Sequence, residues 1–191
     1  MSSGGSQLTE RFGYMSTYKM FFAGSGGQGV ILMGQMVTHA AMLEDKPSTF
    51  FPSYGPEMRG GTASCTVVVS DKTVSCPIIN EADYVVVMNL PSLIKFEPLL
   101  KPGGIMLLNT SRVDRKPERT DITAIEVPAN DLAAELGNAL VANMVMLGAF
   151  VRVTNVVSED SLEKVLRETL GAKKAELLDI NLKAINYWRQ Q

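Results

Sequence analysis

The first half of the chain alternates short apolar runs with one segment of helical length. Residues 18–23 form an apolar run that ends in a cluster of glycines, and residues 30–43 continue as an apolar segment long enough for a helix. This order predicts a strand, a tight turn and a helix. A second strand is predicted over residues 48–51, ended by Pro52, and a third over the β-branched stretch at residues 63–70.

The middle of the chain contains further apolar runs of strand length. Residues 84–88 and 105–108 are continuously apolar, which is typical of strands buried on both faces of a parallel sheet, and residues 123–127 are a weaker candidate. A helix over residues 91–100 would join the first two. Strands that alternate with helices predict an α/β fold, a three-layer sandwich around a mostly parallel sheet with a Rossmann-like glycine turn after the first strand.

The last third of the chain is predicted to be helical. Asp131 is expected to cap a helix that runs through Phe150 and is apolar nearly all round over residues 132–153. Such a helix must be covered on every side, so a partner protein is expected to cover part of it. Two more helices are predicted, one capped by Ser158 and ended by Gly171, the other amphipathic over residues 175–188.

Length and composition favour one domain. With 191 residues and 46% hydrophobic content the chain can bury one sizeable core, and a single domain over residues 18–191 is predicted. Residues 1–17 are predicted to be a flexible leader. The formal net charge of -2 comes from interspersed acids and bases, so neither nucleic acid nor a membrane is expected as a partner. Without a secretory signal or an apolar run of roughly 18 residues, a cytoplasmic location is predicted.

The chain has few residues suited to metal or redox chemistry. Its two cysteines, Cys65 and Cys76, form no C-x-x-C pair, so this chain alone builds neither a disulfide framework nor a zinc or iron-sulfur site. Both are predicted to be packing residues. His39 lies inside the first helix without a second ligand at metal-binding spacing, and it is predicted to be a packing or surface residue.

The glycine cluster matches a dinucleotide fingerprint. Gly24, Gly26 and Gly29 stand at the spacing G-x-G-x-x-G between a predicted strand and a predicted helix. Glycines there allow a tight turn and bring backbone amides of the helix start near an anion. The alternative is a close turn packed against another chain, and the two interpretations remain open. Gln28 offers an amide to a ligand or partner, or is simply solvated.

A nicotinamide dinucleotide is a poor match to this turn. Such a site needs an acid at the end of the second strand to hold the ribose hydroxyls. The predicted strand instead ends in Phe50, Phe51 and Pro52, while Glu44 and Asp45 precede it. NAD is therefore not expected to bind.

The loop over residues 52–62 is dense in residues that fix or free the backbone, which is typical of a loop with a defined shape. Arg59 could form charge-assisted bonds to a phosphate or carboxylate, or pair with Glu57 or a neighbouring chain. The other candidate contacts here are the hydroxyls of Ser53 and Tyr54 and the backbone at Gly60 and Gly61.

Four motifs resemble one known family. They are G-S-G-G-Q-G-V at 24–30, F-P-S-Y-G-P-E-M-R-G-G-T-A at 51–63, M-N-L-P-S-L-x-K-F-E-P-L-L-K-P-G-G at 88–104 and the helix at 138–148 with A-N-M-V-M-L-G-A. Over residues 20 to about 148 the sequence resembles the gamma-type subunit of 2-oxoacid:ferredoxin oxidoreductases, equivalent to one domain of the single-chain pyruvate enzymes. The loop sequence P-S-Y-G-P-E-M-R-G-G resembles that of the 2-oxoglutarate and 2-ketoisovalerate enzymes more than that of the pyruvate-specific enzymes. We rank 2-oxoglutarate first and 2-ketoisovalerate second as the substrate.

The resemblance implies a role inside a larger enzyme. Enzymes of this family oxidatively decarboxylate a 2-oxoacid with thiamine diphosphate, Mg and iron-sulfur clusters, and form an acyl-coenzyme A while reducing ferredoxin. The implied partners are alpha-type, thiamine-binding beta-type and ferredoxin-like delta subunits, together with ferredoxin, and self-association is also expected. This chain has no G-D-G thiamine motif, so it is expected to hold no cofactor and to be inactive alone.

Within such a complex, the resemblance implies that this chain helps to shape the coenzyme A site. No residue is assigned as acid, base or nucleophile. Two alternatives stay open, a purely structural subunit and a free-standing nucleotide-binding enzyme. The candidate contacts are Gly24, Gly26, Gly27, Gln28, Gly29, Ser53, Tyr54, Arg59, Gly60 and Gly61, with Asn89 and Asn143 as weaker ones.

Overall fold

A six-stranded sheet with helices on both faces forms the protein. The computed structural model describes residues 17–55, 61–74, 76–170 and 175–188. In the strand order β2-β3-β1-β4-β5-β6, strands β1, β4, β5 and β6 are parallel, β3 is antiparallel to β1, and β2 is antiparallel to β3. The strands are β1 (Thr17–Ser25), β2 (Ser48–Tyr54), β3 (Thr62–Ser70), β4 (Ala82–Val87), β5 (Leu100–Asn109) and β6 (Thr123–Val127). The predicted α/β class with a mostly parallel sheet is confirmed.

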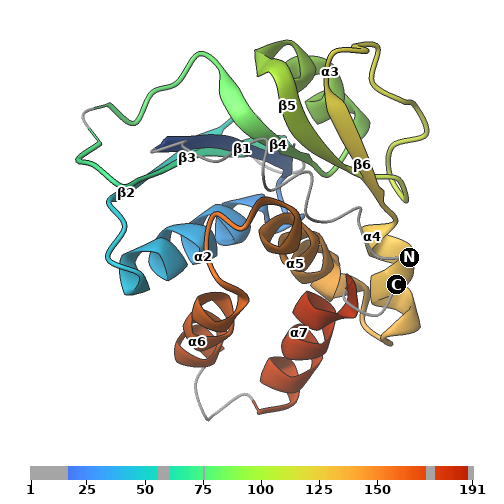
Figure 1. Ribbon diagram of the computed structural model, residues 1–191. Coiled ribbons are helices and arrows are strands. Elements are labelled where there is room, and N and C mark those ends of the chain that lie inside the picture. The colour runs from blue at the N-terminus through green and yellow to red at the C-terminus, as the bar shows by residue number, and fades with distance from the viewer. Residues whose placement is uncertain (1–16, 56–60, 75, 171–174, 189–191) are drawn as a thin grey trace, which may run out of the picture.

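The helices divide unequally between the two faces of the sheet. Figure 1 shows α2, α5, α6 and α7 together below the sheet, whereas α3 lies above it. The larger core fills the lower side, and a smaller core lies between the sheet and α3. The helices are α2 (Val30–Leu43), α3 (Leu90–Phe96), α4 (Ala129–Glu135), α5 (Ala142–Thr154), α6 (Glu159–Leu170) and α7 (Ala175–Tyr187), with 3-10 turns η1 (Glu97–Leu99) and η2 (Ala139–Val141).

The sequence predicted that Pro52 ends the second strand, but the strand continues past it. Strand β2 continues to Tyr54, with Pro52 opposite Cys65 on β3. Because β2 is at the edge of the sheet, it has only one neighbour to bond, and a proline that lacks an N–H is tolerated there. Residues 52–54 of the predicted loop therefore belong to strand β2.

The prediction of a single helix from Asp131 to Phe150 is also wrong. The segment is broken between α4 and η2, where Gly137 has a φ of 83°, and Asp131 lies in the first turn of α4 instead of capping it. A left-handed glycine is a common way to end a helix, and the 3-10 turn that follows redirects the chain into α5.

Helix α5 needs no partner to cover it. Every residue from 142 to 151 is buried within the described chain, against α2, α4, α7 and the sheet. The approach to α7 is close, since a Cβ on Gly148 would lie 2.0 Å from the carbonyl oxygen of Ile185. The expectation that a partner covers this segment was wrong for residues 142–151, because α7 folds back over them. Leu140, in the same predicted segment, is 87% exposed.

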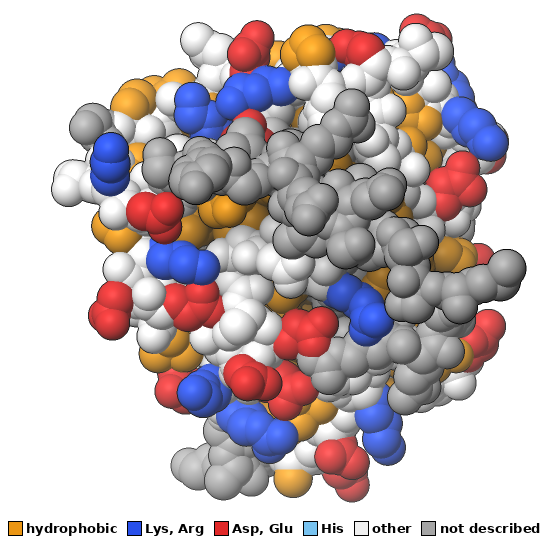
Figure 2. Space-filling view, viewed as in Figure 1, with side chains coloured by type: hydrophobic (Ala, Val, Ile, Leu, Met, Phe, Trp, Pro, Cys, Tyr) orange, Lys and Arg blue, Asp and Glu red, His pale blue; other side chains and the backbone are white. Residues whose placement is uncertain are grey.

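The surface and the cysteines agree only in part with the sequence analysis. No described helix is long and apolar enough to cross a membrane. Figure 2 shows acidic and basic side chains intermixed over the face that it draws.

Cys65 is a buried packing residue, and burial raises the pKa of its thiol to about 12. Cys76 is exposed, so its predicted packing role is wrong.

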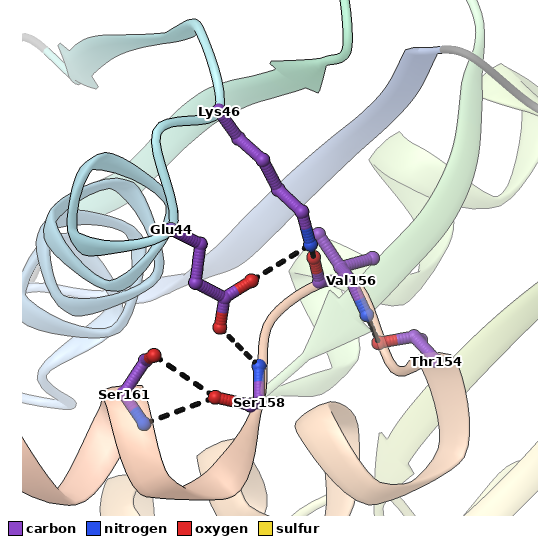
Figure 3. A network of polar contacts seen from close by, with 6 residues as sticks. All are labelled: Glu44, Lys46, Thr154, Val156, Ser158 and Ser161. Atoms are coloured by element: carbon purple, nitrogen blue, oxygen red, sulfur yellow. Dashed lines mark hydrogen bonds and ion pairs between the residues drawn. The ribbon is translucent and has the colours of Figure 1, made fainter.

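A polar network fastens the end of α2 to the start of α6 (Figure 3). The Glu44 carboxylate accepts from the backbone N–H of Ser158 at 2.6 Å and pairs with the Lys46 ammonium at 2.7 Å. Lys46 also donates to the carbonyl of Val156 at 2.8 Å. Ser158 accepts from the N–H of Ser161 at 3.1 Å, so the predicted cap of this helix is confirmed. Two segments 114 residues apart in sequence are thereby joined.

This network sets an acid-dependent part of the stability. Burial raises the pKa of Glu44, but the bonds from Lys46 and Ser158 outweigh it and lower the pKa to about 2. The stabilisation is therefore complete above the unfolded-state value of 4.5 and is lost as the pH falls toward 2.

Glu44→Gln should lower the free energy of unfolding at pH 7 by about 1–2 kcal/mol, a figure reduced for partial solvent screening. The difference from wild type should shrink as the pH falls from 4.5 toward 2, because Glu44 is then protonated first in the unfolded chain and finally in the folded chain. Denaturant unfolding from pH 2 to pH 7 measures it, with the exposed Glu81→Gln as control. A difference that stays constant with pH would contradict the assigned role of the charge.

Candidate functional site

The candidate site lies where two neighbouring parallel strands send their helices to opposite faces of the sheet. After β1 the chain enters α2 below the sheet, and after β4 it enters α3 above it (Figure 1). In open α/β sheets, ligands bind in the crevice that such a divergence leaves beyond the carboxyl ends of the strands. The glycine cluster follows β1 at this point, and Asn89 follows β4.

The first glycine of the fingerprint makes room for a side chain. A Cβ on Gly24 would lie 2.8 Å from the side-chain oxygen of Gln28 and 2.8 Å from Val30. The Gln28 side chain thus folds back over the strand end and does not point into solvent. Gly27 and Gly29 have φ angles of 91° and 72°, so the remaining glycines give the turn its backbone conformation.

The Gln28 side chain forms hydrogen bonds with three other residues. Its Oε1 accepts from the N–H of Ser25 at 2.7 Å and from the side chain of Asn89 at 3.0 Å. Its Nε2 donates to the carbonyl of Met88 at 3.2 Å. The alternative that Gln28 is simply solvated is therefore wrong, and its amide groups serve the internal structure of the site.

Asn89 is similarly engaged within the protein. Its Oδ1 accepts from the N–H of Ser92 at 3.0 Å and so caps α3. Its Nδ2 donates to the hydroxyl of Ser25 at 2.6 Å as well as to Gln28. Ser25, which the sequence analysis did not single out, completes this cluster, and only its position within the motif could have suggested it.

The start of α2 is rich in hydrogen-bond donors. Gly29 occupies the N-cap position and offers no side chain to the first turn of the helix. The N–H groups of Gly27 and Gly29 donate to no described residue. Free donors and the positive end of the helix dipole together suit an anion.

Asn143, from α5, lies directly against this helix start. Its side-chain nitrogen would be only 2.3 Å from a Cβ on Gly29, and the residue is 8% exposed. The amide forms no hydrogen bond with the described residues. Among the described residues, only Thr49 Oγ1 and Asn186 Oδ1 are fully enclosed without a hydrogen bond, so the Asn143 amide is reached from the surface and is open to a ligand at the turn.

The base of the 52–62 segment reaches the same place. The N–H of Gly26 donates to the carbonyl of Gly61 at 2.9 Å, and the N–H of Gly55 donates to the carbonyl of Thr62 at 2.7 Å. Antiparallel pairing of β1 with β3 sets this contact by placing Ser25 opposite Thr62. Two motifs that are far apart in sequence therefore adjoin.

Other predicted site residues lie further out or outside the described structure. Ser53 and Tyr54 are exposed at the end of β2, two strands away from β1, which corresponds to roughly 10 Å. Arg59 and Gly60 lie outside the described residues. His39 is exposed on α2.

The groups gathered at the turn are neutral amides, hydroxyls and backbone. Among the described residues, no cluster of three histidine, cysteine or acidic side chains could hold a metal ion. This set of groups suits binding and orientation better than proton transfer.

The sequence of the chain matches the family model described as pyruvate ferredoxin/flavodoxin oxidoreductase over residues 19–190. The chain belongs to this family. It is 38% identical to the 2-oxoglutarate synthase subunit KorC of Methanocaldococcus jannaschii over 82% of the chain and 86% of KorC. It is 39% identical to the ketoisovalerate oxidoreductase subunit VorA of Methanothermobacter marburgensis over 85% of the chain, but spans only 34% of VorA.

Solved structures of family members share the fold. The gamma subunit of a keto/oxoacid ferredoxin oxidoreductase from Geobacter sulfurreducens aligns with a TM-score of 0.75 and 30% identity, over 88% of this chain and 94% of that one. A 2-oxoglutarate:ferredoxin oxidoreductase from Magnetococcus marinus, with 2-oxoglutarate, coenzyme A and succinyl-CoA bound, aligns with a TM-score of 0.85 and 26% identity, over 93% of this chain and 31% of that one. The resemblance to gamma-type subunits is thus confirmed.

The arrangement of the strands also argues against NAD binding. Strand β1 has two neighbours, the antiparallel β3 and the parallel β4, which is followed by Met88 and Asn89. The described end of β2 carries Tyr54 and Gly55. Among the described residues, none of these strand ends therefore presents an acid that would hold a ribose. Calorimetry of the purified chain with NAD and NADP should show no binding. Micromolar affinity for either would instead support the free-standing nucleotide-binding alternative.

Proposed function

We propose that this chain is the gamma-type subunit of a cytoplasmic 2-oxoacid:ferredoxin oxidoreductase. The complex would convert a 2-oxoacid and coenzyme A to acyl-CoA and CO2, with the two electrons passing to ferredoxin. We rank 2-oxoglutarate first and 2-ketoisovalerate second as substrates. Identities of 35–39% to KorC, VorA and PorC subunits support a 2-oxoacid enzyme, and the ranking of substrates rests on the sequence of the loop at residues 52–61.

The other parts of the catalyst are assigned to partner subunits. Alpha-type, thiamine-binding beta-type and ferredoxin-like delta subunits would hold the thiamine diphosphate, Mg and iron-sulfur clusters, and this chain would hold none of them. The bound thiamine diphosphate supplies the decarboxylation chemistry. The part of this chain would be to bind coenzyme A and orient it.

The observation that supports this role is the unpartnered Asn143 amide at the uncapped start of α2. A phosphate of coenzyme A would accept from the N–H groups of Gly27 and Gly29 and from Asn143. Arg59, whose loop has its base bonded to Gly26, would add a charge-assisted bond. Ser53 and Tyr54 would contact a more distant part of the coenzyme or a partner subunit.

Omission of the chain tests the subunit assignment. A complex reconstituted with all partner subunits should form acyl-CoA from 2-oxoglutarate and reduce ferredoxin or a viologen dye. The isolated chain should be inactive, and the partners without it should form little acyl-CoA. If the partners are equally active without the chain and form no complex with it, the assignment is wrong.

Substitutions at the turn test coenzyme A binding. Asn143→Ala and Arg59→Ala should each raise the KM for coenzyme A about tenfold in the intact complex, because a bond to a charged group is typically worth about 1.5–3 kcal/mol. Asn181→Ala is the matched control, since that amide donates only within α7. Unchanged KM values in complexes that assemble normally would favour the purely structural subunit.

A further inference from the structure

We propose that Asn89 is a positioning residue that fixes the glycine turn through Ser25 and Gln28 and does not itself contact coenzyme A. The proposal rests on the proposed function, because it concerns the same site. It differs from the sequence-based expectation that Asn89 is a direct ligand contact.

The hydrogen bonds of Asn89 leave little of its amide for a ligand. The Oδ1 accepts from Ser92 at 3.0 Å, and the Nδ2 donates to Ser25 at 2.6 Å and to Gln28 at 3.0 Å. A primary amide has two N–H donors, and both are used inside the protein. Asn143 differs, since its amide has no described partner.

Glycine alone cannot hold the turn in one shape. Gly27 and Gly29 have positive φ angles, and Gly26 precedes them, so the segment has wide conformational freedom. The side chain at position 28 is the only one between residues 26 and 29. Its oxygen fixes the N–H of Ser25 at 2.7 Å, so the Gln28 bonds select one shape of the turn.

Asn89 in turn fixes Gln28. It donates to the same Gln28 oxygen from the far side of the divergence between α2 and α3. Because the backbone carbonyl of Met88 takes the other end of the Gln28 amide at 3.2 Å, the side chain is held at both ends by the segment after β4. The direction of the N–H groups at the start of α2 therefore depends on a residue that caps α3. Such preorganisation lowers the entropy lost on binding.

Asn89→Ser separates capping from positioning. Serine is also a good N-cap, so α3 keeps its cap, but the shorter side chain cannot reach Ser25 and Gln28. In the reconstituted complex the KM for coenzyme A should rise about three- to tenfold, as expected for lost neutral hydrogen bonds, while kcat at saturating coenzyme A changes less than twofold. Hydrogen exchange at the hydrogen-bonded amides of Ser25, Gly26 and Gln28 should become faster. Asn181→Ser is the matched control.

A double-mutant cycle with Gln28→Ala distinguishes positioning from contact. If Asn89 acts through Gln28, adding Asn89→Ser to Gln28→Ala should raise the KM little further. Fully multiplicative effects, or an unchanged KM for Asn89→Ser, would overturn the proposal. If Asn143→Ala raises the KM while Asn89→Ser does not, only the positioning role fails. If neither changes it, the coenzyme A site fails, and the role of Asn89 with it.

Discussion

Strand β1 pairs with two neighbours of opposite direction, and this pairing decides where a site can form. Its parallel neighbour β4 ends beside it, so the segments that follow both strands meet at one edge of the sheet. Its antiparallel neighbour β3 begins at that same edge, which brings the base of the 52–62 segment to the glycine turn. A sheet in which all the strands ran parallel would have placed the start of β3 at the opposite edge. The single antiparallel strand between β1 and β2 thus unites motifs that the sequence keeps well apart.

Much of the fold could be predicted because local patterns agreed with the tertiary structure. Helix α2 was predicted over the observed residues, since an apolar run of helical length bounded by turn residues leaves few alternatives. The weaker candidate strand at residues 123–127 also matches β6. The failures occurred where distant contacts decided the outcome. Whether Pro52 ends a strand depends on that strand being at an edge, and the cover of α5 depends on where α7 packs. Neither fact is encoded near the residues concerned.

The sequence predicted the position of the glycine turn at the candidate site, but not the hydrogen bonds of the residues around it. The spacing of Gly24, Gly26 and Gly29 located the turn, and family resemblance pointed to Asn89 and Asn143. Side-chain identity could not tell that one asparagine is bonded on all sides while the other is not, because an amide suits a scaffold as well as a ligand. That difference exists only once β4 and α5 have been brought to the turn.

Helix α7 closes the larger core over α5 within the described residues, and this has a consequence for how such domains evolve. A domain whose larger core is enclosed by its own helices can keep the same packing when other sequence is joined to it. Fusion of its gene to a neighbour, or separation from one, would then leave the packing unchanged. The relatives illustrate both arrangements, since the chain spans 86% of one KorC subunit but only 34% of a VorA subunit.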